Sequence, residues 1–350
     1  MKRILSLCLS LLLLTGILAG CTETAPEQTQ PIQQEDETLK ILMIGGSLGY
    51  DTMYMMPAVA KNEGWTDVSF GILYRSAGLK SLTPYAQSGR PEFAYLEYVV
   101  GEDEAWRRAQ GNGNFTISVP SEANDKFIED GSIAVTAEFA LQRMDWDIVI
   151  IMSSSSEITN VSNDLNMANA EAMMTYVKEH DLNPATTPEF GWHMIWSLPE
   201  DSTLWNEARS KFMAQHYNNN AMAMFEDNVK NTQQIVVPAL EGKIKYLFPC
   251  VAALQNAKSS TVVTDKDIHR DFIHGTDYAR LIAAYVWYCE LTDTNIRDCK
   301  FGPVPNGIVR DNEIRNSGKD YELSEEWKQV LIESVENAIQ KPYELTPSAY

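Results

Sequence analysis

The chain has 350 residues, of which 48 are acidic and 28 are basic, and its formal net charge is −20. A charge of this sign and size argues against nucleic acid or an anionic membrane surface as the binding partner. The length suits one large α/β domain, because neither an internal repeat nor a second linker divides the sequence.

The N-terminal residues have the pattern of an export signal. A positively charged start and a short apolar stretch lead into Leu18-Ala19-Gly20-Cys21, which resembles the lipobox of bacterial lipoproteins. We therefore predict a signal peptide over residues 1–20, lipid attachment at Cys21 and a disordered tether over 21–38. The folded domain is expected at residues 39–345, on the bacterial cell surface or the periplasmic face of a membrane. The alternative is an ordinary secretory signal in which Cys21 has no role.

Strand-like and helix-like runs alternate along the rest of the chain. Buried strands are predicted at Leu39–Gly45, Val68–Tyr74, Trp146–Met152, Phe190–Ser197 and Lys245–Pro249, and an edge or excursion strand at Phe115–Val119. Helices are predicted at Met53–Glu63, Met167–Glu179, Ser202–Val229, Ala252–Lys258, Thr276–Leu291 and Ser324–Ile339. This alternation predicts a single three-layer α/β domain with a central, mostly parallel five-stranded sheet flanked by helices.

Polar residues follow several of the predicted strands at their carboxyl ends, where ligands bind in parallel sheets. Ser47 follows the first strand, Gly78 the second and residues 153–156 the third, while Asp271 and His274 come after the fifth. Because these positions share one edge of the predicted sheet, we expect a functional site there.

Three of these residues have the chemistry of a nucleophilic triad. Ser47 is the candidate nucleophile, His274 the base and acid, and Asp271 the residue that orients the imidazole. The glycines before Ser47 would permit tight backbone angles and a close approach of substrate. The backbone amides of Ser47 and Gly78 are candidate donors to an oxyanion. Each residue also has a structural interpretation: Ser47 as a turn serine, His274 as a histidine at the start of a helix and Asp271 as a helix cap. His269 is an alternative candidate for the histidine.

These blocks resemble those of the SGNH/GDSL hydrolase superfamily. Gly46-Ser47-Leu48 is similar to its Gly-Asp-Ser-Leu block with glycine in place of aspartate, Asp271-Phe272-Ile273-His274 matches its Asp-x-x-His block, and Gly78 resembles its second-block glycine. More narrowly, the chain resembles an uncharacterised family of bacterial exported lipoproteins with a Trp-His-Met-x-Trp motif. The residues that carry this narrower resemblance are Ile44–Ser47, Trp146–Val149, Phe190–Trp196, Ala253–Ala257 and Ala283–Tyr288.

The resemblance implies an SGNH/flavodoxin-like fold and a third oxyanion donor. The superfamily usually has an asparagine after the third strand, whereas this chain has Met152-Ser153-Ser154-Ser155-Ser156. A serine hydroxyl, that of Ser153, is the expected replacement. A flexible loop or a weakened site is the alternative.

Substrate contacts are expected from the aromatic motif. Trp192 and Trp196 would share one face of a strand, and together with His193 and Asn256 we predict that they bind substrate. Aromatic walls of this kind suit sugar rings. Packing in the hydrophobic core is the alternative for the tryptophans.

The expected function is therefore an extracytoplasmic serine esterase that removes acyl groups from a carbohydrate or glycan ester. The alternatives are a saccharide-binding lipoprotein without turnover and a glycan O-acyltransferase. Neither a cofactor nor a metal is implied, nucleic acid is not an expected partner, and contact with the membrane is expected through the lipid alone. A Cys289–Cys299 disulfide is also compatible with an oxidising compartment.

Overall fold

The computed structural model describes residues 38–109, 116–120, 127–159, 165, 167–183, 185–305 and 322–350, and of strands β5 and β6 the backbone alone. The predicted signal peptide, Cys21 and almost all of the predicted tether lie outside these residues.

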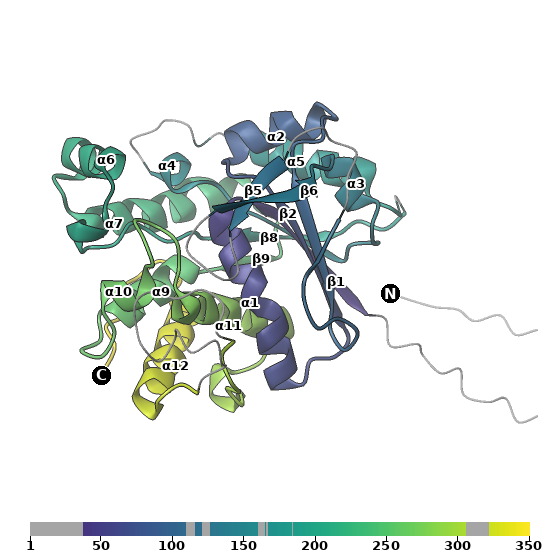
Figure 1. The fold of residues 1–350 in the computed structure, drawn as a ribbon. Helices are drawn as coiled ribbons and strands as arrows, with labels where there is room; N and C mark the ends of the chain where they lie inside the picture. Colours follow the sequence, from purple (N-terminus) through teal and green to yellow (C-terminus); the bar gives the residue numbers. More distant parts are fainter. Residues whose placement is uncertain are drawn as a thin grey trace, which may run out of the picture. The chain divides into compact units, whose positions relative to one another are not determined.

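A seven-stranded sheet in the order β4-β3-β2-β1-β7-β8-β9 forms the centre of the fold (Figure 1). Its strands are β1 (Leu39–Gly45), β2 (Val68–Tyr74), β3 (Ala94–Val99), β4 (Arg107–Arg108), β7 (Ile148–Ile151), β8 (Glu189–His193) and β9 (Tyr246–Phe248). Strands β2, β1, β7, β8 and β9 run parallel, which confirms the predicted mostly parallel sheet. The predicted count of five strands was wrong, because β3 pairs antiparallel with β2 and β4 with β3. A separate antiparallel pair, β5 (Thr116–Pro120) and β6 (Phe127–Ile133), includes the predicted excursion strand.

Helices cover both faces of the sheet. Helices α1 (Ser47–Glu63), α9 (Cys250–Lys258), α11 (Asp277–Thr292) and α12 (Glu325–Gln340) pack together on one face, and α2 (Leu79–Gln87), α3 (Ala137–Leu141) and α5 (Met167–His180) on the other (Figure 1). The other helical segments are α4 (Ser155–Ile158), α6 (Glu207–Tyr217), α7 (Ala221–Asn231), α8 (Val237–Ala239), α10 (Asp265–Ile268), the 3₁₀ turns Ser202–Leu204 and Ile296–Asp298 and a π turn at Thr232–Val236. Strand β7, in the middle of the sheet, is therefore buried along its whole length.

The single helix predicted over Ser202–Val229 was wrong. Asn206 caps the start of α6, so the helix begins only at residue 207. At its end Asn218 and Asn219 adopt left-handed φ angles of 49° and 59°. Asn220 then caps α7 through its side chain. Asparagine tolerates the left-handed region and caps helices well, so these residues break one helical pattern into two helices.

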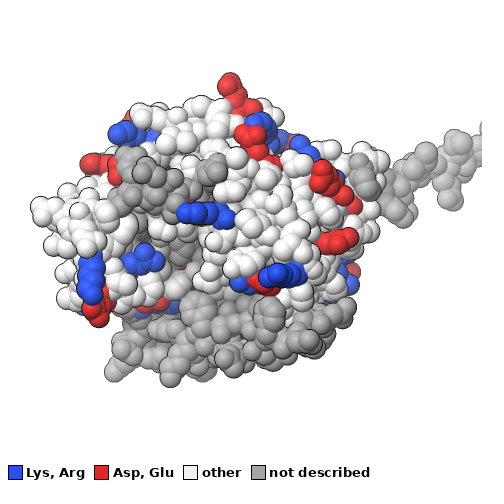
Figure 2. Space-filling view, turned by 90° about the horizontal axis from the view of Figure 1, so that it is seen from above, with Lys and Arg blue, Asp and Glu red and all other residues white. Residues whose placement is uncertain are grey.

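Two surface properties bear on the function. Acidic and basic side chains are interspersed over the described part of the face seen from above, so the net charge is not gathered into one patch there (Figure 2). Among the described residues, no helix has both the length and the apolar character needed to cross a membrane.

Candidate active site

Ser47 stands at the junction of β1 and α1, in the middle of the sheet. Strand β1 pairs with β2 and β7 on either side, so the carboxyl ends of these three strands meet there. Gly46 has an ordinary negative φ of −89°, and Gly45 is not among the glycines with positive φ, so the prediction of unusual backbone angles was wrong. Close packing explains Gly45 instead, because a Cβ atom there would lie 2.6 Å from Cγ of Met152.

The structure brings His274, which lies 227 positions after Ser47 in the sequence, and its neighbour Asp271 to the serine. His274 Nε2 lies 2.9 Å from Ser47 Oγ, and His274 Nδ1 lies 2.6 Å from Asp271 Oδ2. The other carboxylate oxygen of Asp271 accepts hydrogen bonds from the backbone amides of Ile273 (2.8 Å) and His274 (2.7 Å). Burial raises the pKa of Asp271, but the hydrogen bonds and charge of His274 outweigh burial and hold that pKa well below its usual value. Asp271 is therefore ionised and able to orient the imidazole.

A buried ion cluster under this loop was missed in the sequence. Asp51 is fully buried in α1, and its carboxylate accepts hydrogen bonds from Arg270, from Arg280 and from the backbone amide of Gly275 at 3.1 Å. Burial raises the pKa of Asp51, but the charges of the two arginines lower it below its usual value. The cluster ties the residue after His274 to the helix that begins at Ser47. Asp51 lies one helical turn after Ser47, a spacing that could have signalled a shared face.

A tryptophan holds the same loop from the other side. Trp196 is buried, and its indole N–H donates to the carbonyl oxygen of Ile273 at 2.6 Å. The competing His269 is also buried and pairs through its backbone with Gly275, so it supports the loop and does not line the cavity at Ser47.

The second predicted oxyanion donor, Gly78, adjoins the same cavity. Its neighbours Leu79 and Lys80 donate their backbone amides to Glu157 at 3.0 and 2.9 Å, whereas no bond is seen from the amides of Ser47 or Gly78 to other described residues. A Cβ atom on Gly78 would clash with the Glu157 carboxylate, so a larger residue there would have to displace the carboxylate from these amides. Glu157, which the sequence did not single out, thus neutralises the start of α2 and fixes its place.

The serine run contributes a different residue from the one predicted. Ser153 is buried and is not part of the described cavity lining. Ser154 lines the cavity, together with Ser155 and Ser156. The Ser154 side chain caps α4 by accepting from the amide of Glu157, and its hydroxyl lies 3.2 Å from that of Ser156. Three of the serines that line the cavity therefore come from one short capped turn.

The cavity at Ser47 has a volume of about 390 Å³. Its described lining consists of Gly46, Ser47, Leu48, Ser76, Ala77, Gly78, Met152, Ser154, Ser155, Ser156, Arg209, Phe272, Ile273 and His274. The lining is largely apolar or hydroxylic, and Arg209 is its one described side chain with a permanent charge. This size suits a small ligand or a single side group of a larger one.

The predicted substrate residues do not form a wall of this cavity. Trp192, His193, Trp196 and Asn256 are each at most 1% exposed, and none belongs to the described lining. His193 accepts a hydrogen bond from Trp287 at 3.0 Å, and burial lowers its pKa to about 3. The prediction failed for Trp192 and His193 because helices cover both faces of β8. Trp196 lies beyond the end of β8 and Asn256 lies in α9, and both are packed in the core.

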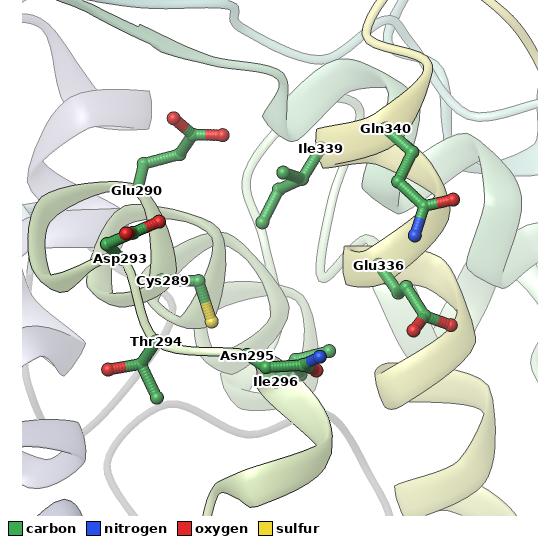
Figure 3. A pocket seen from close by; sticks show the side chains of 9 residues that line it. All are labelled: Cys289, Glu290, Asp293, Thr294, Asn295, Ile296, Glu336, Ile339 and Gln340. Carbon is green, nitrogen blue, oxygen red and sulfur yellow. The ribbon is translucent and has the colours of Figure 1, made fainter.

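A second cavity lies between the end of α11 and α12 (Figure 3). Cys289, Glu290, Asp293 and Glu336 contribute to its lining. Cys289 and Cys299 are free thiols, and the contact between them, together with burial, raises the pKa of Cys289. Within the described residues, no group of three or more His, Cys, Asp or Glu is placed to hold a metal ion. A serine with a base in reach is found at the first cavity, which is therefore the candidate active site.

The fold and site define a three-layer α/β protein with a Ser-His-Asp constellation at the carboxyl ends of its central strands. The chain belongs to the DUF4886 family, whose model is described as a domain of unknown function and matches residues 126–318. The matched segment contains Asp271 and His274 but not Ser47, and the family description assigns no activity.

Solved structures and curated proteins were compared with the chain as well. A crystal structure of a DUF4886 family protein from Bacteroides uniformis is similar, with 19% identity, a TM-score of 0.62, and coverage of 88% of this chain and 97% of that one. This likeness supports the fold. A second structure, a protein from Slackia heliotrinireducens described as "a putative SGNH hydrolase", has 14% identity and a TM-score of 0.40 over 72% of this chain and 98% of that one. No curated protein sequence matches the chain significantly.

Proposed function

We propose that this protein is a serine hydrolase of SGNH type that cleaves carboxylic esters at Ser47. One observation carries the proposal: Ser47, His274 and Asp271 form a continuous hydrogen-bonded chain with distances of 2.9 and 2.6 Å. A serine hydroxyl is a weak nucleophile unless a base in hydrogen-bond reach takes its proton, and the base needs an orienting partner. A structural serine needs neither.

The proposed reaction has two halves. Ser47 Oγ attacks the ester carbonyl carbon while His274 Nε2 takes the hydroxyl proton, and the amides of Ser47 and Gly78 donate to the oxyanion. The tetrahedral intermediate collapses, the C–O bond to the alcohol breaks, and His274 returns its proton to the departing alkoxide. Water then attacks the acyl-serine with His274 as base, which releases the carboxylic acid and restores Ser47. Asp271 stays ionised and stabilises the imidazolium that forms in each half.

The substrate proposed is an ester with a small group at the scissile bond. A cavity of about 390 Å³ fits such a group, and its apolar and hydroxylic lining suits an acyl chain or the edge of a polar alcohol. Trp192 and Trp196, which led to the expectation of a sugar ring, are buried away from this cavity, so the proposed substrate is an ester without a defined sugar. An acyltransferase would use the same acyl-serine with a different acceptor.

Covalent labelling tests the proposal directly. A fluorophosphonate probe reacts with an activated serine hydroxyl, so we expect stoichiometric labelling at Ser47, identified by peptide mass spectrometry. Ser47→Ala should abolish both labelling and hydrolysis of 4-nitrophenyl acetate without lowering the melting temperature. Ser156→Ala, another hydroxyl of the same cavity, is the matched control and should still be labelled at Ser47. Absence of labelling in the wild-type protein would favour a binding protein on the same fold.

The cellular location is proposed from the sequence alone. The Leu18–Cys21 run after a short apolar segment supports a lipid anchor at Cys21. Cys21→Ala should move the protein from the membrane fraction to the soluble fraction, and intact mass should establish whether the signal was cleaved. A cleaved Cys21→Ala protein that stays with the membrane would contradict the anchor.

A further inference from the structure

Arg209 sits in the wall of the catalytic cavity without belonging to the triad. It lies in the first turn of α6, and its guanidinium lies 5.4 Å from the centre of the Phe272 ring. Phe272 lies between Asp271 and Ile273 in the loop that carries His274. Helix α6 thus brings a cation to the loop that holds the catalytic base, from a segment more than 60 residues earlier in the chain.

No described carboxylate forms an ion pair with Arg209. This distinguishes it from other arginines of the fold: Arg270 and Arg280 bind Asp51, and Arg75 pairs with Glu92 at 3.0 Å. Its neighbour Lys211, on the same helix, pairs with Glu207 at 2.6 Å. Arg209 is half-buried, and desolvation lowers its pKa below the ordinary arginine value. The Arg209 guanidinium has lost part of its water, and no described carboxylate pairs with it, so it can bind an anionic ligand from outside.

The rest of the lining favours an anion. The described wall of the cavity contains no aspartate or glutamate, and its polar side chains besides Ser47, His274 and Arg209 are those of serines 76 and 154–156. Two described carboxylates near the cavity are already engaged, Glu157 by backbone amides and Asp271 by His274. An anionic ligand therefore meets one cation and several hydroxyl donors. A single cation suits a monoanion, whereas the net charge of −20 disfavours a polyanion.

We propose that Arg209 is a specificity-determining residue, and that the esters cleaved at Ser47 carry a carboxylate which the guanidinium binds. The planar fork of arginine matches the two oxygens of a carboxylate. The inference rests on the proposed esterase function and narrows its substrate class. The carboxylate can belong to the acyl group or to the alcohol, and each source gives a different substrate pair below.

Paired substrates of nearly equal shape separate the two sources. The first pair, mono(4-nitrophenyl) succinate and the neutral 4-nitrophenyl succinamate, places the charge in the acyl group. The rate for the succinate is corrected for its spontaneous reaction. The second pair, 4-acetoxybenzoate and the neutral 4-acetoxybenzamide, places the charge in the alcohol. We expect kcat/KM to favour the anionic member of one pair, and Arg209→Gln to reduce that preference about tenfold to a hundredfold, the range of a charge-assisted hydrogen bond. Arg209→Lys should restore part of the preference, and Lys211→Gln should leave both values unchanged.

The outcomes separate this inference from the function on which it rests. If the neutral esters are hydrolysed and Ser47 is labelled, but the preference is absent or is the same in Arg209→Gln, the inference is overturned and the esterase remains. If the wild-type protein hydrolyses neither pair and Ser47 is not labelled, both are overturned. A preference that Arg209→Gln removes and Arg209→Lys partly restores supports the carboxylate site, because loss of packing alone would reduce turnover of both members alike.

Discussion

Replacing Asp51 with asparagine tests whether the buried ion cluster holds the catalytic loop. The change keeps the shape of the side chain but removes the negative charge between Arg270 and Arg280, which are 4% and 0% exposed. Among the described carboxylates of this cluster, Arg280 then keeps Asp277, 3.9 Å away, as its charged partner. Removing one member of a buried ion pair costs about 3–5 kcal/mol, because the remaining charges stay buried.

This loss should be visible in both stability and activity. In a domain of this size about 3–5 kcal/mol corresponds to a fall in melting temperature of roughly 5–8 °C, measurable by calorimetry. Asp51 also accepts the amide of Gly275 at 3.1 Å, so the variant should lose turnover even when fully folded. Glu207→Gln is the matched control, because it removes an exposed ion pair with Lys211 and should change the free energy of unfolding by less than about 1 kcal/mol. An Asp51→Asn protein that is as stable and active as the control would refute the anchoring role.

Three further predictions concern the loop, the glycine and the pH dependence of stability. His274→Ala should lower kcat by several powers of ten in the ester assay, whereas folded His269→Ala should keep most activity; the reverse order would reject the triad. Gly78→Ala should reduce turnover at least tenfold, since its Cβ would lie 2.1 Å from Glu157, and a crystal structure with Glu157 unmoved would contradict this reason. Burial lowers the pKa of His193 to about 3, so as the pH falls below about 6.5 this histidine takes up a proton in the unfolded chain but not in the folded protein. The contribution of the neutral, buried His193 to the free energy of unfolding is therefore present above about pH 6.5 and is lost progressively below it. Urea unfolding at pH 7 and pH 5 should show about 2 kcal/mol more loss in the wild-type protein than in His193→Gln, and equal losses would place the imidazole in contact with water.

The sequence was informative where the relevant physics is local. Continuous apolar runs such as Ile148–Ile151 identified the strands buried on both faces, and the structure confirms the mostly parallel sheet. The Asp271–His274 spacing identified a pair that can bond because its members lie three positions apart along one loop. Ser47 was found because it lies two positions after the last residue of a strand. Each signal lies within a few consecutive residues, so it could be read without the fold.

Residues whose role depends on distant partners were decided by the tertiary structure alone. Asp51 and Arg270 are 219 residues apart, and Arg209 reaches Phe272 from a separate helix. Their charges are ordinary in the sequence, and their functional meaning comes from burial and from which neighbours the fold supplies. The same cause misdirected the prediction for Trp192, since alternation along a strand indicates a face but not what covers it. The spacing of residues along the sequence indicated which side chains could react. The packing of helices against the sheet decided which cavity these side chains share and which other residues line that cavity.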